Sequence, residues 1–309
     1  MTQSTTAVFD ETERQRALDA LHIVGSLPEP AYDDIVKVAA AVCGTPMALV
    51  TLIDRDRQWF KARTGLEGVQ TERNVAVCDH AIRQPTELME VGDLTQDARF
   101  ADNPVLKDIG ARFYAGMPLV TEDGAAVGSV CVVDLNPRQL NATQREALQA
   151  LARITMNLME GRSRERDQQV AAILAHGVAE ETAAAPDAAG SYTVVILELQ
   201  DLSAAAQRLG ERGLDRQLQQ LDQSLEQCLQ PERGDSINRV TGSGEFIAVL
   251  GSADASDTLA KLEQVARDTQ QSLGVALLLG AASTHTAEAT TAVFLRADKA
   301  LSAAKDALR

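Results

Sequence analysis

Residues 236–250 of this 309-residue chain read SINRVTGSGEFIAVL, and this stretch decides the fold of the second half. Apolar residues gather in two short runs, Ile237–Val240 and Phe246–Leu250, of which the first is interrupted by two polar residues. The glycine-rich segment GSGEF, residues 242–246, leads from one run into the other. Two strand-like runs on either side of a glycine-rich turn predict a β-hairpin.

The rest of the second half alternates between strand-like and helical patterns. Tyr192–Leu199 and Gly274–Ala281 are apolar runs of strand length. Apolar residues recur at helical spacing at 202–209, 213–229 and 255–271, and again from about residue 287. Strands that alternate with helices, together with one hairpin, predict an α/β or α+β sandwich.

The first half mixes the same two patterns. Residues 11–42 have helical spacing that is interrupted at Pro28–Pro30. The expected strands are Met47–Ile53, a segment around Trp59 and Phe60, Gly116–Val120 and Ala126–Val133. The chain as a whole is therefore expected to be of the α+β class.

One long helix is predicted between the two halves, from about residue 143 to residue 182. Asn141 or Thr143 is the expected N-cap, and Glu146 follows Thr143 at the spacing of a capping box. A linker-like stretch that contains Pro186 follows the helix.

The apolar residues of this helix allow two interpretations. Heptad spacing with a polar face is typical of a two-stranded coiled coil, which would make the protein a homodimer. The alternative is an amphipathic helix that packs on its own domain. The charged run Arg162–Asp167 favours pairing, because it would otherwise project from a small domain. The apolar stripe consists of Leu148, Leu151, Thr155 and Leu158, followed by Val170, Ile173, Leu174 and Val178.

Composition narrows the classes of partner. The formal net charge is −15 and the pI is about 4.7, which disfavours nucleic acid and anionic membrane surfaces. The first ten residues lack a signal region, and no apolar run approaches the ~18 residues of a membrane span. The four cysteines are scattered along the sequence, and no two of them form a CxxC pair. A cytoplasmic protein with reduced thiols is expected.

Residues 16–160 resemble a GAF sensory domain. The resemblance implies an antiparallel sheet of about six strands, with helices on one face and a ligand pocket on the other. Such pockets hold cyclic nucleotides, tetrapyrroles or other small molecules. The segments that carry the resemblance are ALVTLID (48–54), DRQWFK (56–61), CDHAI (78–82), DARFADNP (97–104), RFYAGMPL (112–119) and GSVCVVD (128–134).

Five residues are the candidates for ligand contacts in this pocket: Cys78, Asp79, His80, Arg112 and Tyr114. Covalent tetrapyrrole attachment in some GAF proteins uses a Cys followed directly by His, whereas Asp79 intervenes here. A redox role for Cys78 would need a thiolate that nearby positive charge stabilises, for which His80 and Arg83 are the candidate neighbours. The alternative for Cys78 is a buried core thiol. The aromatic residues Trp59, Phe60, Phe113 and Tyr114 could line the pocket, and their alternative is core packing.

The hairpin and the segments around it resemble the GGDEF domain of diguanylate cyclases. The resemblance covers residues 191–309, so residues 143–190 would form a signalling helix and linker. The implied fold is the α/β sandwich of nucleotide cyclases, and the implied reaction joins two GTP molecules with the help of Mg²⁺. Carboxylates must converge on such a metal ion, because Mg²⁺ prefers hard oxygen ligands.

Several positions depart from the family pattern. Glu198 takes the place of the first metal-binding carboxylate, and Gly244 takes the place of the second. Glu245 is the carboxylate of the family motif that is still present in the hairpin. Alternatively, it is simply a polar residue beside a turn. The two positions that read guanine in the family fall on Ala206 and Gln207. Lys305 and Arg309 correspond to phosphate-binding residues, although cations at a helix C-terminus are also favoured for structural reasons.

The sequence therefore predicts a non-catalytic signalling protein without a bound metal. A GAF input domain would be coupled by a helix to a degenerate GGDEF domain that serves in dimerisation or in binding a protein partner. Two alternatives stay open: a weak diguanylate cyclase with Mg²⁺, and a receptor that binds GTP without turnover.

Overall fold

The computed structural model describes residues 10–184, 192–251, 255–284 and 288–308. Contacts divide the chain into two compact units, and each is described by itself. The first unit comprises the chain up to Val24 and Pro28–Ser163, and the second comprises Gly25–Leu27 and the chain from Arg164 onward. No helix in the described ranges has the apolar length that a membrane crossing needs.

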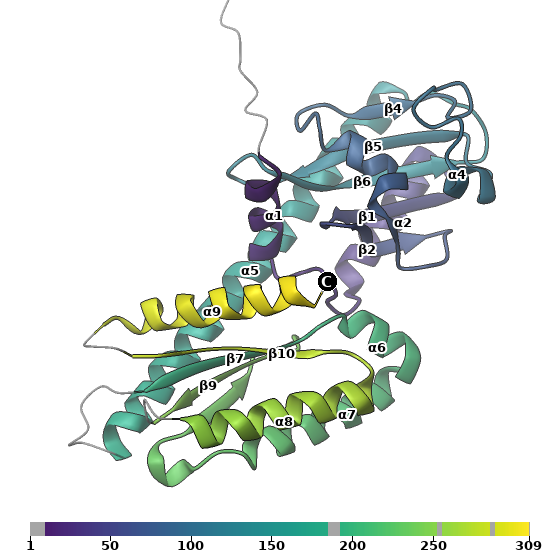
Figure 1. Cartoon of the computed structure of the whole chain (residues 1–309). Helices are drawn as coiled ribbons and strands as arrows, with labels where there is room; N and C mark the ends of the chain where they lie inside the picture. Colours follow the sequence, from purple (N-terminus) through teal and green to yellow (C-terminus); the bar gives the residue numbers. More distant parts are fainter. Residues whose placement is uncertain (1–9, 185–191, 252–254, 285–287, 309) are drawn as a thin grey trace, which may run out of the picture. The chain divides into compact units, whose positions relative to one another are not determined.

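A six-stranded antiparallel sheet forms the centre of the first unit, in the order β3-β2-β1-β6-β5-β4 (Figure 1). Its strands are β1 (Met47–Ile53), β2 (Arg57–Thr64), β3 (Gln70–Glu72), β4 (Met89–Val91), β5 (Phe113–Val120) and β6 (Ala126–Asp134). The helices of this unit are α1 (Glu11–Ala20), α2 (Pro30–Cys43), α3 (Val77–Ala81), α4 (Pro104–Asp108), the short 3-10 turn η1 (Arg73–Val75) and the first half of α5 (Ala142–Ala184).

Both faces of this sheet are covered. Adjacent residues of a strand point to opposite faces, so Trp59 and Phe113 enter one core while Phe60 and Tyr114 enter the other. The first core also contains residues of α1, α2 and α5, and the second contains residues of α3 and α4. All four aromatic side chains are buried, which corresponds to the core-packing alternative.

Helix α5 begins with a capping box. The Asn141 side chain accepts the backbone N–H of Gln144 at 2.9 Å, and the Gln144 side chain accepts the N–H of Asn141 at 3.1 Å. Thr143 and Glu146 have the same spacing as Asn141 and Gln144, so the sequence could not distinguish the two pairs. The alternative with Thr143 as the N-cap is wrong by two residues. Gln144 also donates to the carbonyls of Val42 and Cys43, which end α2, at 3.2 Å each.

Most of the predicted apolar stripe of α5 packs within the chain, whereas Leu158 is exposed. Leu148, Leu151 and Thr155 are buried in the first unit, while Val170 and Leu174 are buried in the second. The charged run Arg162–Asp167 was expected to project from a single domain, and this expectation is wrong for two of its arginines. Arg162 bonds to Glu29 and to the carbonyl of His22 within the first unit, and Arg166 is buried within the second.

The second unit contains a four-stranded antiparallel sheet in the order β10-β7-β9-β8. Its strands are β7 (Thr193–Leu199), β8 (Ser236–Arg239), β9 (Glu245–Leu250) and β10 (Leu277–Ser283). Its helices are the second half of α5, α6 (Leu202–Leu209), α7 (Glu211–Glu226), the 3-10 turn η2 (Pro231–Arg233), α8 (Ser256–Leu273) and α9 (Thr290–Ala307). Helices α5 and α9 cover one face of the sheet, and α6, α7 and α8 cover the other.

The predicted hairpin is confirmed as β8 and β9, and the α+β class with its long helix between two mixed units is confirmed as well. The short elements β3, β4, α3 and α4 were not predicted. Each has three to five residues, too few to show a hydrophobic period.

Candidate functional site

The turn between β8 and β9 is stabilised by side-chain bonds. Ser243 donates its hydroxyl to the carbonyl of Val240 at 2.9 Å and accepts the N–H of Glu245 at 3.2 Å. The backbone closes the hairpin with a bond from the Val240 N–H to the Glu245 carbonyl at 2.8 Å. The serine in the second position of the motif therefore supports the turn, and Glu245 leaves it as the first residue of β9.

Glu198 and Glu245 lie directly opposite each other on the neighbouring strands β7 and β9. Strand alternation directs both to the face that α5 and α9 cover, the same face that Ile196 and Ile247 reach. Like charges in direct cross-strand register repel each other. The pair is therefore stable only where cations neutralise it.

Arg166 of α5 neutralises Glu245. Its guanidinium approaches both carboxylate oxygens, with an Nε–Oε2 distance of 2.9 Å and a second bond from Nη2 to Oε1. The side chains are only 10% and 5% exposed, so this is a buried two-point salt bridge. Burial raises the pKa of Glu245, and Arg166 offsets part of that rise. The sequence did not identify Arg166, because a buried arginine within a charged run leaves no periodic signal.

Lys305 of α9 neutralises Glu198, with an Nζ–Oε2 distance of 2.7 Å. Gln200 donates to the other carboxylate oxygen at 3.2 Å. Lys305 thus bonds to a carboxylate of its own unit. Arg309, the second expected phosphate contact, lies outside the described residues.

Gly244 faces the opposite side of the sheet. A Cβ atom at this position would lie 2.8 Å from Leu202 Cδ1 and 2.9 Å from Leu199 Cβ. Both leucines belong to the core beneath α6, α7 and α8. The space that a carboxylate side chain would need is therefore filled with apolar groups.

A divalent cation does not fit this arrangement. Glu198 and Glu245 each bond already to a cationic side chain. Gly244, at the position of the second metal-binding carboxylate, has no ligand atom in its side chain and no room for a larger side chain. Within the described ranges, no group of three His, Cys, Asp or Glu side chains converges to hold a metal ion. Ala206, at one of the two guanine-reading positions, is part of α6 and packs against the apolar core.

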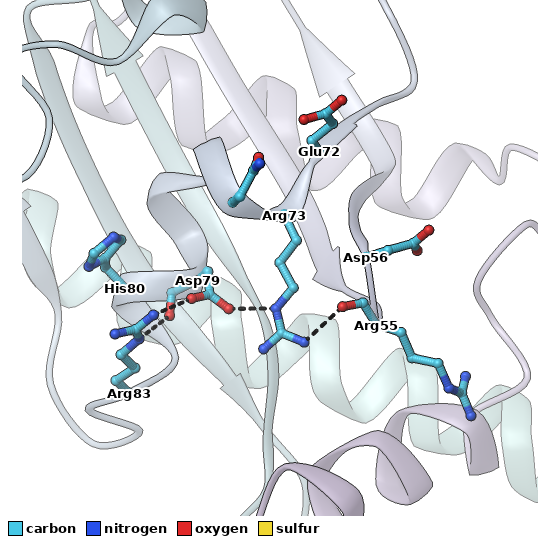
Figure 2. Close-up of a pocket in the computed structure, with 8 residues that line it drawn as sticks. Arg55, Asp56, Glu72, Arg73, Asp79, His80 and Arg83 are labelled. Atoms are coloured by element: carbon cyan, nitrogen blue, oxygen red, sulfur yellow. Dashed lines mark hydrogen bonds and ion pairs between the residues drawn. The ribbon is translucent and has the colours of Figure 1, made fainter. Parts of the chain in front are cut away.

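A pocket of about 670 Å³ lies on the first unit, beside α3 (Figure 2). Its lining is strongly polar, with arginines and carboxylates from three neighbouring segments. The lining residues are Arg55, Asp56, Glu72, Arg73, Asn74, Asp79, His80 and Arg83.

Asp79 organises the cations of this pocket, and Figure 2 shows it between Arg73 and Arg83. Arg73 Nε donates to one carboxylate oxygen at 2.7 Å, and Arg83 Nη2 donates to the other at 2.6 Å. Burial opposes ionisation of Asp79, but the hydrogen bonds from Arg83 and Arg73 outweigh it and lower the pKa. Arg73 also bonds to Glu11 at 2.6 Å.

His80 lies at the edge of the same pocket. Its ring meets the edge of Phe100 with the centroids 4.9 Å apart. Burial and the neighbouring Arg83 lower the pKa of His80, so the imidazole is neutral at pH 7. A neutral ring offers one donor and one acceptor to a polar ligand.

The structure brings only two of the five candidate residues into this pocket, Asp79 and His80. Cys78 lies on the buried side of α3 and Tyr114 is buried in β5, where its hydroxyl lies 3.2 Å from Cys78 Sγ. Arg112 pairs with Asp93 at 2.6 Å and does not line the pocket. Arg55 and Arg73 were not among the sequence candidates, because their place in the pocket depends on how distant segments fold together.

Comparison with known families agrees with both units. The family described as "GAF domain" matches residues 28–157, and the family described as "Diguanylate cyclase, GGDEF domain" matches residues 171–309. Among curated proteins, the chain is similar to "Cyclic di-GMP phosphodiesterase PA2567" of Pseudomonas aeruginosa, with 39% identity over 149 residues. That match covers 48% of this chain and only 25% of the relative's length.

Solved structures of both kinds of domain are among those to which the chain is similar. A GAF domain of PixJ from Thermosynechococcus elongatus, in its blue-light absorbing form, is 15% identical and has a TM-score of 0.39, with 52% of this chain and 96% of that chain covered. A microbial GGDEF domain described with cyclic di-GMP is 24% identical and has a TM-score of 0.37, with 43% of this chain and 84% of that chain covered. On the two family matches, this chain belongs to the signalling proteins in which a GAF domain is followed by a GGDEF domain.

Proposed function

We propose that this chain is a non-catalytic member of a cyclic di-GMP signalling system. Its GAF domain would receive a small-molecule signal, and its GGDEF domain would act in dimerisation or in binding a protein partner. The name of the Pseudomonas relative, a cyclic di-GMP phosphodiesterase, supports the signalling context. The chain spans a quarter of that relative, so the phosphodiesterase activity is not transferred to it.

One observation carries the proposal that the GGDEF domain is degenerate. Its two remaining carboxylates, Glu245 and Glu198, are each neutralised by a cation of the same unit. A metal ion would have to displace Arg166 from a buried salt bridge, which would leave the buried guanidinium without its carboxylate and is therefore costly. A cyclase reaction needs two metal-bound triphosphates, so this cost would apply at each active site.

Product analysis tests the absence of catalysis. The purified chain is incubated with GTP and either Mg²⁺ or Mn²⁺, and cyclic di-GMP is measured against a Glu198→Gln/Glu245→Gln variant. We expect no product above that variant. Cyclic di-GMP from the wild-type chain alone would establish the weak cyclase instead.

Calorimetry distinguishes the third function, a receptor that binds GTP without turnover. Titration with GTP and Mg²⁺ is expected to release no binding heat at millimolar ligand. A saturable heat that disappears in a Lys305→Met variant would identify a GTP receptor, in which Lys305 contacts phosphate rather than Glu198.

The proposed dimer is supported by apolar residues that remain exposed on the first unit. Gln144 at the start of α5 bonds to the end of α2, and Arg162 farther along α5 bonds to Glu29, which precedes α2. The two helices therefore run side by side in opposite directions. Between those contacts they expose four apolar side chains: Val38 and Val42 on α2, with Ile154 and Leu158 on α5. On each helix the two residues are four positions apart and therefore lie on the same side of that helix. Exposed apolar residues grouped in this way support an interface.

The proposed input is a small ligand with both acidic and basic groups, bound in the pocket beside α3. Arginines and carboxylates of that pocket are interleaved, so a ligand of one charge sign would meet repulsion as well as attraction. Hydrogen-bonding ligands of that kind suit a polar pocket in which Asp79 fixes two guanidinium groups.

A further inference from the structure

Two cysteines meet in the core of the GAF domain, on the face of the sheet that α3 covers. Cys78 belongs to α3 and Cys131 to β6, 53 residues later, and their sulfur atoms are 3.8 Å apart. Both are free thiols with 2% and 1% of their surface exposed. The separation is that of two sulfurs in van der Waals contact, so a small shift of α3 would bring them to the ~2.05 Å of a disulfide bond.

A tyrosine and a glycine shape the space around this pair. Gly116 of β5 lies directly opposite Cys131 of β6. A Cβ atom at position 116 would lie 2.2 Å from the Tyr114 hydroxyl, so only glycine lets this ring lie along the strand. In that position the hydroxyl reaches Cys78 Sγ at 3.2 Å, where it can donate a hydrogen bond to a thiolate.

The surroundings make the two thiols unequal. Burial opposes the thiolate of Cys78, but hydrogen bonds from Cys131, Ser129, Thr51 and Tyr114 outweigh it and lower the pKa of Cys78. The hydrogen bond to Cys78, together with burial, raises the pKa of Cys131. These donors are neutral groups, whereas the sequence suggested His80 and Arg83 as cationic neighbours. A thiolate beside a protonated thiol is the arrangement of a nucleophile and a resolving cysteine.

We propose that Cys78 and Cys131 form a redox-active dithiol that is oxidised to an intradomain disulfide by a hydroperoxide. The Cys78 thiolate attacks one peroxide oxygen, the O–O bond breaks, and a sulfenic acid forms while the leaving alkoxide or hydroxide takes up a proton. The Cys131 thiol then attacks the sulfur of that sulfenic acid, and water leaves. Two thiols and one hydroperoxide thus give one disulfide, one alcohol or water, and one further water, with two electrons passing from sulfur to oxygen.

Oxidation would change the geometry of the polar pocket, because Cys78 and Asp79 are neighbours on the same short helix. Cys78 points into the core, while Asp79 holds Arg73 and Arg83 at the pocket wall. A helix of five residues also opens at low cost, which would give a small peroxide access to the buried sulfur.

Peptide mapping of the full chain tests the proposal. The folded protein is treated with hydrogen peroxide, quenched, denatured, alkylated with N-ethylmaleimide and digested with trypsin without reduction. We expect the peptide 74–83, which contains Cys78, to appear linked to the peptide 113–138, which contains Cys131. The linked species should be about 2 Da lighter than the sum of the free peptides, and dithiothreitol should separate it again.

Variants make the assignment specific. In a Cys43→Ser/Cys228→Ser chain the number of alkylated cysteines should fall from two to none, and circular dichroism verifies that this chain is folded. In the single variants Cys78→Ser and Cys131→Ser no linked peptide should form. The proposal is overturned if both thiols remain alkylatable after excess peroxide, if Cys78 goes on to sulfinic acid without a link, or if either sulfur pairs with Cys43 or Cys228 instead.

Discussion

Arg166 of the connecting helix and Glu245 of the signature hairpin form a buried two-point salt bridge, with Nε 2.9 Å from Oε2. The two residues are 79 positions apart in the sequence. The carboxylate that survives from the family motif thus serves to anchor α5 to the sheet of the GGDEF domain. Two charges with almost no solvent contact depend on each other, because neither has water to replace its partner.

Arg166→Met is expected to destabilise the GGDEF domain by about 3–5 kcal/mol, since it leaves Glu245 buried and unpaired. Urea unfolding measures the change. Arg164→Met is the matched control, because Arg164 is an exposed cation one half-turn earlier and should change little. The double variant Arg166→Met/Glu245→Met should recover most of the loss. Equal and additive losses from the two single changes would contradict the buried pair.

Gly244→Asp restores the missing carboxylate in the sequence but should not restore a metal site. The new side chain would collide with Leu199 and Leu202, so we expect a loss of about 1–3 kcal/mol and no cyclic di-GMP synthesis. In a Leu202→Ala background the same change should cost less, because the space is open. Thermal unfolding and product analysis measure the two effects. Synthesis by the Gly244→Asp chain would show that a metal site forms despite the collision.

Lys61 should make the stability of the GAF domain depend on alkaline pH. Burial lowers the pKa of Lys61 from 10.5 to about 8, although Glu29, 2.7 Å away, partly opposes the shift. Between pH 8 and 10.5 the unfolded chain holds this proton and the folded chain does not. Stability relative to a Lys61→Met variant should therefore rise across that window by up to about 3 kcal/mol and be constant below pH 8.

Urea unfolding of both proteins at several pH values measures this difference. Lys37→Met is the matched control, since Lys37 is an exposed lysine of the same domain. A difference between Lys61→Met and wild type that does not vary with pH would show that the folded domain keeps the Lys61 ammonium protonated.

Ile154→Asp/Leu158→Asp should convert the proposed dimer into a monomer. Two carboxylates placed at these exposed positions of α5 would have to be buried without partners in the interface. Light scattering after gel filtration measures the mass. Leu135→Asp is the control, because Leu135 is similarly exposed in the same domain but lies outside the two helices. A wild-type chain that is already monomeric would refute the dimer.

Local pattern was enough to predict the main elements. The hairpin, the long helix and the alternation of strands with helices follow from hydrophobic spacing, which short-range physics determines. The N-cap of α5 shows where that information ends. Asn141 with Gln144 and Thr143 with Glu146 satisfy the same spacing rule, and only the contact of Gln144 with the end of α2 separates them.

The site was harder to predict, because it is made of long-range contacts. Arg166 looks like a solvated charge in a charged run, and Cys131 looks like an ordinary apolar residue within a strand. Each acquires its role from a partner more than 50 residues away, Glu245 and Cys78 respectively. The sequence of the hairpin was enough to show that a carboxylate is missing at Gly244. It did not show that Arg166 and Lys305 pair with the carboxylates of Glu245 and Glu198.

Gln144 joins two helix ends with one side chain, since it completes the cap of α5 and also satisfies the last carbonyls of α2. Helix termini normally fray independently of each other. Here the loss of a single amide would expose unbonded carbonyls on α2 and an unbonded N–H at Asn141 together. The end of α2 and the start of α5 should therefore unfold together in one step. Protection from hydrogen exchange should fall at both of these helix ends simultaneously.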